Sequence, residues 1–387
     1  MDDLLTHRPV NKAYYHAPLT LQLSDYPDFD SGDPYEFQWA GTENPYPVEV
    51  DIYQKLDPAA LYKIYLGIDI GSTSTKAMMM GSDQAVLAGF YTRTAGRPVA
   101  AVQSIFAAIA DTAEKKGVVL QVIGAGTTGS GRKFAGKIIG ADLIVDEITA
   151  HARAAWQLNP QVDTIIEIGG QDSKFTTLKD GTVTFSIMNT VCAAGTGSFI
   201  EEQAQKLGCP LDEFSSRTEN QRSPLASDRC TVFMERDLNH YLNEGYAVNE
   251  VLASVLHSIR ENYLTKVAIE NNIGKTILFQ GATAKNKALV AAFEQRLKKP
   301  IHVSRYCHLT GALGTALLLS EQKISPTKFR GLGLHKKRIP IQSEVCELCT
   351  NHCKITLADM GGERVAYGFL CGRDYDTAKY VSNCLLY

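Results

Sequence analysis

The feature that most constrains this fold is a short pattern that occurs twice, about one hundred residues apart. Each copy has an apolar run, an acidic residue, another apolar residue, a glycine, a polar turn and a lysine. The copies are Ile68-Asp69-Ile70-Gly71-Ser72-Thr73-Ser74-Thr75-Lys76 and Ile166-Glu167-Ile168-Gly169-Gly170-Gln171-Asp172-Ser173-Lys174. Glycine lets backbone N–H groups approach an anion, and hydroxyl side chains add donors. A single copy is also compatible with a plain β-hairpin, but two matching copies indicate two phosphate-binding turns.

The segment around these turns alternates between strand and helix signals, which indicates an α/β fold. Short runs rich in β-branched residues predict strands at residues 64–70, 118–124, 164–168, 182–188 and 276–279. Apolar periodicity predicts helices at residues 100–116, 198–207, 249–270 and 287–297.

Composition divides the chain into four zones. Residues 1–61 are rich in proline, tyrosine and acidic residues, and we expect an extended arm on a folded surface or on a partner; a loose tail is the alternative. Residues 62–322 form the expected α/β core. Residues 323–344 form a basic linker, and residues 345–387 contain five of the nine cysteines.

Bulk properties exclude some classes of function. The net charge of −3 provides no basic face for nucleic acid. The acidic start lacks the features of a signal peptide, and no apolar run reaches the roughly 18–20 residues of a membrane helix. We therefore expect a cytoplasmic protein that binds neither nucleic acid nor membrane.

Two cysteines lie at expected helix starts. Cys192 opens Cys192-Ala193-Ala194-Gly195-Thr196-Gly197, and Cys230 opens Cys230-Thr231-Val232-Phe233. The positive end of a helix dipole favours the thiolate and therefore metal ligation. Two buried apolar cysteines are the simpler alternative. Their polar neighbours argue against that alternative.

A third glycine turn, Gly281-Ala282-Thr283-Ala284-Lys285-Asn286, closes a strand and opens a helix. In order and spacing, the three turns resemble the superfamily of sugar kinases, actin and heat-shock chaperone ATPases. The resemblance implies two actin-like (ribonuclease H-like) α/β lobes around a nucleotide cleft that binds ATP and Mg²⁺. The implied catalytic residues are Asp69, Glu167 and Gln171, although aspartate is usual where this chain has Glu167. The implied nucleotide-binding residues are Gly71, Ser72, Thr73, Ser74, Lys76, Gly169, Gly170, Gly281, Ala282 and Asn286.

The cysteine motifs narrow the resemblance. Together with residues 168–172, 126–132 and 308–314, they resemble the activators (archerases) of 2-hydroxyacyl-CoA dehydratases and the ATPase subunits of benzoyl-CoA reductases. The similarity covers roughly residues 65–319. It implies that Cys192 and Cys230 of two subunits hold one [4Fe–4S] cluster across a homodimer. The implied activity is ATP-driven electron transfer from a donor such as ferredoxin or flavodoxin. The acceptor would be a dehydratase, a benzoyl-CoA reductase-like enzyme or a double-cubane cluster protein.

The ligand count agrees with a dimer. Such a cluster generally takes four thiolates, and the core offers two that are well placed. Cys209 and Cys307 are interpreted as structural. Two chains around one cluster complete the set and satisfy two-fold symmetry.

The tail predicts a further metal site. Cys346-x₂-Cys349-x₃-Cys353-x₁₇-Cys371 has short ligand-like spacings, with His352 inside the set. The missing second C-x₂-C pair favours a second iron–sulfur cluster over structural zinc, and both remain open.

Two other functions fit the same fold. A small-molecule kinase would need an aspartate base, for which Asp172 or Asp228 are candidates. A regulatory sugar-kinase-like ATPase with a zinc-stabilised tail is the other. A kinase would leave Cys192 and Cys230 without a purpose.

Overall fold

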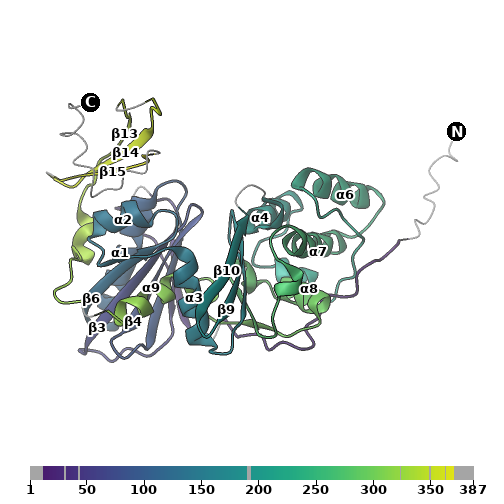
Figure 1. Ribbon diagram of the computed structural model, residues 1–387, viewed down its shortest axis with the longest axis horizontal. Helices are drawn as coiled ribbons and strands as arrows, with labels where there is room; N and C mark the ends of the chain where they lie inside the picture. Colours follow the sequence, from purple (N-terminus) through teal and green to yellow (C-terminus); the bar gives the residue numbers. More distant parts are fainter. Residues whose placement is uncertain are drawn as a thin grey trace. The chain divides into compact units, whose positions relative to one another are not determined.

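A computed structural model of the chain describes residues 12–29, 32–41, 44–189, 193–322, 324–347, 350–361 and 363–369. The chain divides into two compact units. Unit 1 comprises Met1–Phe29 and Ala152–Thr310, and unit 2 comprises Asp30–His151 and Gly311–Tyr387. Both are built of a sheet covered by helices (Figure 1).

Unit 2 is built on a seven-stranded sheet. The strands run in the order β1 (Asp33–Phe37), β2 (Val48–Ile52), β5 (Val86–Arg93), β4 (Ser74–Gly81), β3 (Leu61–Ile70), β6 (Val119–Thr128) and β7 (Leu143–Ile144). Strand β3 pairs antiparallel with β4 and parallel with β6. It is buried on both faces from Leu66 to Ile70, as its nearly continuous apolar sequence predicts.

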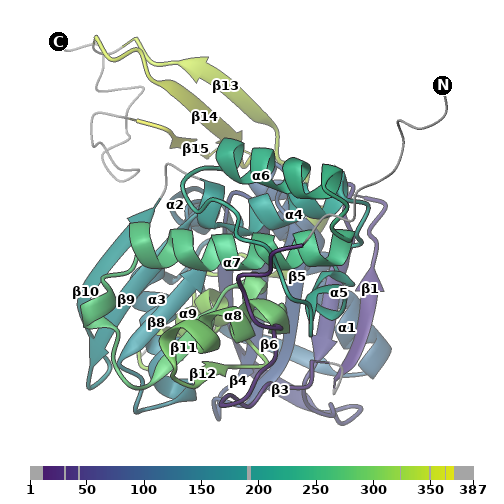
Figure 2. The same ribbon diagram turned by 90° about the vertical axis from the view of Figure 1, so that its right-hand side faces the viewer.

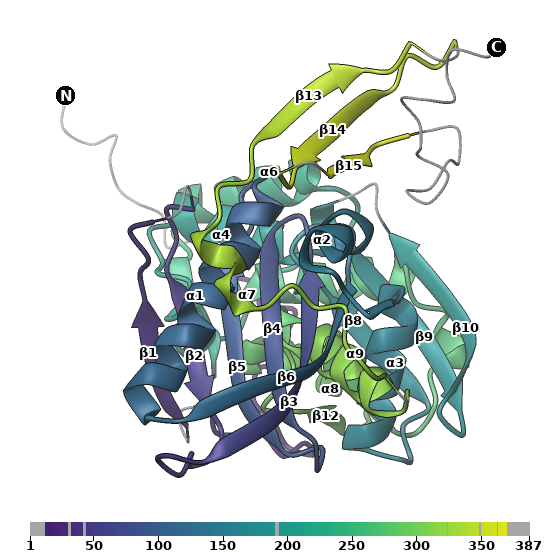
Figure 3. The same cartoon turned by 90° about the vertical axis from the view of Figure 1, so that its left-hand side faces the viewer.

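Helices cover both faces of this sheet (Figure 3). Leu66 and Ile68 of β3 share a buried cluster with α1 (Pro98–Lys116) and α2 (Arg132–Ile139). Gly67 points the opposite way, because side chains alternate along a strand. A Cβ at Gly67 would lie 1.9 Å from the carbonyl oxygen of Ala312 in α9 (Thr310–Ser320), so glycine is required for this close approach.

Unit 1 is built on a five-stranded sheet. The order is β10 (Thr182–Asn189), β9 (Ser173–Lys179), β8 (Thr164–Ile168), β11 (Ile277–Gln280) and β12 (Ile301–Val303). Strands β8, β9 and β10 form an antiparallel meander, and β8, β11 and β12 are parallel.

The helices of unit 1 enclose its main core. They are α4 (Gly197–Lys206), α5 (Phe214–Thr218), α6 (Thr231–Asn243), α7 (Val248–Lys266) and α8 (Lys287–Leu297). Tyr263 of α7 and Phe279 of β11 both pack edge-on against Phe293 of α8. Helix α3 (Glu147–Leu158) packs through Ala152 and Ala155 against strands β8, β9 and β11.

The N-terminal arm lies on unit 1 over residues 12–29 (Figure 2). Its path crosses the α7 and α8 region, where Leu19 is completely buried. The following residues differ from the expected arm, because β1 and β2 join the sheet of unit 2. The alternating Val48, Val50 and Ile52 of β2 are buried and supply the apolar face that the proline content of this zone obscured.

A small antiparallel sheet follows the core of unit 2. It consists of β13 (Ile341–Val345), β14 (Lys354–Asp359) and β15 (Arg364–Tyr367). Tyr367 packs its ring near Phe134 of α2, and Ala358 and Val365 join the unit 2 core. The zone expected to be a basic linker therefore already contains most of β13.

The expected strands and helices are confirmed, but three boundaries differ by three or more residues. Strand β3 begins at Leu61 rather than at residue 64, and β6 continues to Thr128 rather than ending at residue 124. The helix predicted to reach Glu270 ends at Lys266, and a short 3₁₀ turn, η2 (Glu270–Asn272), follows it. Among the described residues, none of the helices has both the length and the apolar character needed to span a membrane.

Candidate functional site

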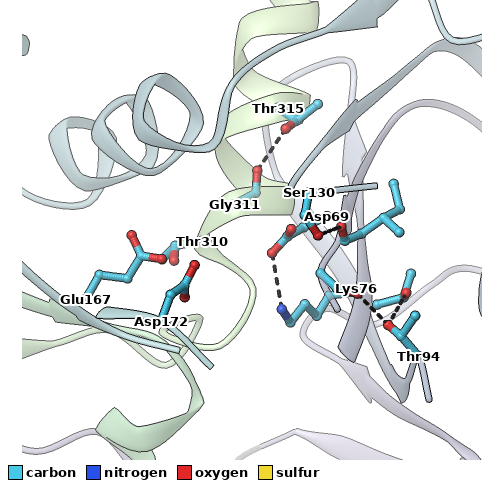
Figure 4. A network of polar contacts seen from close by, with 12 residues as sticks. Asp69, Lys76, Thr94, Ser130, Glu167, Asp172, Thr310, Gly311 and Thr315 are labelled. Atoms are coloured by element: carbon cyan, nitrogen blue, oxygen red, sulfur yellow. Dashed lines mark hydrogen bonds and ion pairs between the residues drawn. The ribbon is translucent and has the colours of Figure 1, made fainter. Parts of the chain in front are cut away.

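The first repeat forms the β3–β4 hairpin of unit 2. Its turn is tight, because the N–H of Gly71 donates to the carbonyl oxygen of Ser74 at 3.0 Å. Thr94 directly follows strand β5. Its hydroxyl donates to the carbonyl oxygen of Gly71 at 2.8 Å and holds the turn in place. Asp69 and Lys76 face each other across the hairpin, with Lys76 Nζ 3.3 Å from Asp69 Oδ2 (Figure 4).

Space beside the Asp69 carboxylate is kept clear by two glycines. A Cβ at Gly129 would lie 2.5 Å from Asp69 Oδ1, and one at Gly311 would lie 2.9 Å from Asp69 Oδ2. Gly129 also has a φ of +84°, which disfavours other residues. Asp69 is buried, so a ligand that uses this space meets a carboxylate with little competing water.

The second repeat forms the equivalent β8–β9 hairpin of unit 1. The N–H of Gly169 donates to the carbonyl oxygen of Asp172 at 2.9 Å, as in the first turn. Glu167 and Lys174 occupy the register positions that correspond to Asp69 and Lys76. Lys174 is 2% exposed, and its Nζ lies 2.9 Å from Glu167 and 3.2 Å from Asp172. Gln171 is an exposed turn residue.

Three buried hydroxyl groups near the hairpins have no hydrogen-bond partner among the described residues. They belong to Thr73, Thr128 and Ser173. Thr128 is the neighbour of Asp69 on the parallel strand β6. Buried polar groups are normally satisfied, so these hydroxyls are available for an anion or hydrated cation. Thr73 was predicted from the sequence to bind nucleotide, whereas Thr128 and Ser173 were not.

The third turn packs directly against the second hairpin. Gly281 has a φ of +97°, and a Cβ there would lie 2.2 Å from the carbonyl oxygen of Ile168. Ala282 begins the 3₁₀ turn η3 (Ala282–Lys285), in which the hydroxyl of Thr283 also donates to the Ile168 carbonyl. Asn286 caps α8, because its side-chain oxygen accepts from the N–H of Leu289 at 3.0 Å.

The structure therefore collects the sequence-predicted residues into two groups. Asp69, residues 71–74 and Lys76 lie together in unit 2. Glu167, residues 169–171 and the third turn lie together in unit 1. Lys174 belongs to the repeat but was not predicted to be a site residue, and Asp172 was a candidate only for the kinase alternative. The position of Lys174, equivalent to that of Lys76, was the signal that could have identified it.

Cys230 is the N-cap residue of α6, in an extended conformation and partly exposed. The prediction that it precedes a helix is confirmed. Cys192 lies outside the described residues; a short 3₁₀ turn, η1 (Ala193–Gly195), and then α4 follow it. The structural interpretation of Cys209 and Cys307 is confirmed, since both are buried in the unit 1 core. Burial raises the pKa of the Cys307 thiol to about 12, which disfavours a thiolate ligand there.

The start of α4 is bonded to the second hairpin. The N–H groups of Gly197 and Ser198 donate to the carbonyl oxygens of Gly169 and Gly170, both at 2.8 Å. The Ser198 hydroxyl also donates to the Gly170 carbonyl. The start of α4 is therefore attached directly to the turn that contains the candidate phosphate-binding glycines.

Two of the predicted tail ligands can be placed. The N–H of Cys346 donates to the carbonyl oxygen of Cys353 at 2.7 Å, and both residues are buried beside Ile355 and Leu357. Cys349 and Cys371 lie outside the described residues. Within the described ranges, no group of three or more His, Cys, Asp or Glu side chains is arranged to hold a metal ion.

Two α/β units that carry equivalent acid–glycine–lysine hairpins define an actin-like ATPase fold. The chain belongs to the BadF/BadG/BcrA/BcrD ATPase family, whose model matches residues 66–319. This match confirms the resemblance drawn from the motifs.

Individual relatives match about two thirds of the chain. The chain is 34% identical over 272 residues to an uncharacterised protein of Methanocaldococcus jannaschii, with 68% of this chain and 64% of that protein's length aligned. It is 32% identical to the activator of lactoyl-CoA dehydratase of Anaerotignum propionicum, over 66% of this chain and 97% of the relative. The solved activator of the 2-hydroxyisocaproyl-CoA dehydratase from Clostridium difficile, with bound ADPNP, is 26% identical with a TM-score of 0.58. That alignment covers 67% of this chain and 94% of the solved chain.

Proposed function

We propose that this protein is an ATP-dependent activator that couples ATP hydrolysis to single-electron transfer from a [4Fe–4S] cluster into a partner enzyme. The observation that carries the proposal is the bonding of α4 to Gly169 and Gly170. Through it, the helix that follows Cys192 is attached to a candidate phosphate turn. A change at the nucleotide therefore has a direct covalent and hydrogen-bonded route to the cysteine segment.

In this proposal the two hairpins bind MgATP. Residues 71–74 and Lys76 bind phosphate oxygens from unit 2, and Gly169 and Gly170 do so from unit 1. The third turn, with Gly281, Ala282 and Asn286, receives the adenosine. ADPNP in the related Clostridium difficile activator supports an adenine nucleotide as the ligand.

Mg²⁺ fits beside Asp69. The space that Gly129 and Gly311 keep clear adjoins a carboxylate oxygen on each side, and hard oxygen ligands are those that Mg²⁺ prefers. When bound, Mg²⁺ neutralises charge on the phosphates. Glu167 orients the attacking water together with Gln171, and the buried Lys174 holds Glu167 in place.

The cysteines fit a cluster shared between two copies. Cys230 is a partly exposed thiol at the N-terminus of α6, where the helix dipole favours a thiolate. Val232 and Phe233, just after it, are 72% and 44% exposed, as expected for a surface that a second subunit covers. Cys192 and Cys230 of both subunits would supply four thiolates. The cluster, when bound, supplies a one-electron carrier.

The partner is proposed from the names of relatives. Two of them are activators of 2-hydroxyacyl-CoA dehydratases, so a dehydratase of this class, or a related reductase, is the proposed acceptor. A low-potential donor such as ferredoxin or flavodoxin would reduce the protein. We also propose that the tail holds a second iron–sulfur cluster rather than zinc; the adjacent backbones of Cys346 and Cys353 support a shared ligand site.

The kinase alternative has weaker support. A kinase base must accept a proton from a substrate hydroxyl. Asp172, one of the two candidates, is ion-paired with Lys174 at 3.2 Å, which opposes that role.

Anaerobic purification tests the proposal. We expect a brown protein with iron and sulfide, an ATPase activity, and ATP-dependent reduction of an acceptor. Replacing Cys230 or Cys192 with Ser should remove the core iron, whereas Cys209→Ala, which changes a buried structural thiol, should retain it. Wild-type protein that hydrolyses ATP but holds no iron would contradict the electron-transfer function.

A further inference from the structure

Helix α7 contains two adjacent polar residues that reach different parts of the proposed site. Asn262 extends toward the cysteine segments, and Tyr263 extends toward the second phosphate hairpin. Both residues are buried, at 1% and 0% exposure, and all of their contacts described below lie within unit 1.

Asn262 holds the segment that leads to Cys230. Its Nδ2 donates to the carbonyl oxygen of Asp228 at 2.5 Å and to that of Arg229 at 3.2 Å. These are the two residues immediately before Cys230. The backbone that presents Cys230 as the N-cap of α6 is therefore fixed to α7 by one side chain.

The other end of the Asn262 amide faces the first cysteine segment. A Cβ at Gly195 would lie 2.8 Å from Asn262 Oδ1, so Gly195 lets the backbone after Cys192 approach this amide. Asn262 Oδ1 has no hydrogen-bond partner among the described residues, although it is fully buried. One side chain therefore contacts both the segment that leads to Cys230 and the segment that follows Cys192.

Tyr263 connects the same turn of α7 to the nucleotide side. Its hydroxyl donates to the carbonyl oxygen of Lys174 at 2.6 Å. The Lys174 side chain in turn pairs with Glu167 and Asp172. The ring of Tyr263 packs edge-on against Phe293, which holds it independently of the hydroxyl.

We propose that Asn262 and Tyr263 are positioning residues that make the Cys230 segment follow the second phosphate hairpin. Helix α4 is bonded directly to Gly169 and Gly170, but α6 has a different route: from Lys174 through Tyr263 and Asn262 to the Asp228 and Arg229 carbonyls. Through Asn262 and Tyr263, a change of the second phosphate hairpin on nucleotide binding reaches the start of α6 as well as the start of α4. This inference rests on the proposed function.

Iron release from the full-length, anaerobically purified protein tests it. A ferrous chelator is added in the presence of MgADP or of MgADPNP, and the ratio of the two release rates measures the nucleotide response. Iron released by the Cys230→Ser variant is subtracted, because it reports metal held elsewhere. ATP hydrolysis is measured in parallel for each variant.

Tyr263→Phe removes the hydroxyl and keeps the ring, and Asn262→Ala removes the amide. Ser254→Ala is the matched control, because it removes a buried hydroxyl of α7 that bonds only locally, to the Val251 carbonyl at 2.7 Å. We expect the nucleotide response to fall by about fivefold or more in the two test variants, within the range of allosteric couplings. The rate of ATP hydrolysis should stay near wild type in both test variants. Ser254→Ala should keep both the hydrolysis rate and the nucleotide response of iron release near wild type.

A wild-type response in Tyr263→Phe would overturn the inference, even if Asn262→Ala fails to fold. Parallel loss of hydrolysis and response would also overturn it, since Tyr263 would then serve the nucleotide site itself. A wild-type protein that holds iron without any nucleotide response would overturn the proposed function, and the inference with it.

Discussion

The ammonium group of Lys174 lies 2.9 Å from the carboxylate of Glu167, directly opposite it on the next strand and almost completely out of contact with solvent. The equivalent pair of the first hairpin, Lys76 and Asp69, is longer and more exposed, at 3.3 Å with 16% of the lysine side chain accessible. One repeated pattern has therefore placed a fully buried lysine in one unit and a partly accessible lysine in the other, beside carboxylates whose side chains are similarly buried, at 8% and 11% exposure.

Lys174→Met should destabilise the protein strongly. The substitution removes the buried positive charge that pairs with Glu167, and breaking a buried ion pair costs about 3–5 kcal/mol in comparable cases. Lys76→Met is the matched control and should cost clearly less, because the Lys76 side chain is partly accessible to water and its ion pair is longer. Urea unfolding of the two variants measures the difference. Equal losses of stability would show that the burial difference has no energetic effect.

Gly311→Ala should weaken metal-dependent nucleotide hydrolysis. Its Cβ would lie 2.9 Å from Asp69 Oδ2 and 3.1 Å from His151 Nε2, in the space proposed for Mg²⁺. We expect an increase of about tenfold or more in the Mg²⁺ concentration needed for half-maximal activity, as for other disturbed metal sites. Gly333→Ala, whose Cβ would meet no atom within 4 Å, is the control. Unchanged Mg²⁺ dependence of the Gly311 variant would exclude this metal position.

Glu294→Leu should release the arm. The Glu294 carboxylate accepts N–H bonds from Gln22, Leu23 and Ser24 at 2.7, 3.0 and 2.7 Å. Charge-assisted bonds contribute about 1.5–3 kcal/mol each, so the variant should unfold at lower urea concentration and lose protease protection in residues 12–29. Glu270→Ala, which breaks an exposed pair with Arg296, should have little effect. Continued protection of the arm would contradict its attachment through Glu294.

Acidification should loosen the same arm through His16. Its ring stacks on that of His257 at 3.9 Å, and burial, with Arg260 nearby, lowers the pKa of His16 to about 4 and that of His257 to about 2. Both pKa values are below the unfolded value of about 6.5. Their stabilising effect is therefore complete above pH 6.5 and is lost as the pH falls toward 4 and below.

His16→Phe keeps the stacked ring and removes one titration. The difference in unfolding free energy between pH 6.5 and pH 5 should be smaller in this variant than in wild type. Measuring both proteins at the two pH values cancels the contribution of the carboxylates that titrate in the same range. Identical pH dependence would contradict the stacked, partly buried position of His16 beside His257.

The sequence predicted those parts of the site whose neighbours are close along the chain. Asp69 and Lys76, like Glu167 and Lys174, become partners through a tight hairpin, so the repeat was enough to place them. Thr128 reaches Asp69 only through parallel pairing of β3 and β6, which no local pattern specifies. Asn262 is an asparagine within a helix, near the C-terminal end of α7, and only the three-dimensional structure shows what it contacts. Strands β1 and β2 were missed because the composition of their zone outweighed the alternation in Val48–Ile52.

The contact between Glu294 and the arm determines how freely the amino-acid sequence of the arm can change. One carboxylate binds three successive main-chain N–H groups, and any residue except proline provides such a group. Leu23 is itself 56% exposed, so its side chain is little constrained by this attachment. Residues 22 and 23 can therefore drift among descendants of this protein without loosening the arm, and an acidic residue in α8 is the better marker of its presence than any residue of the arm.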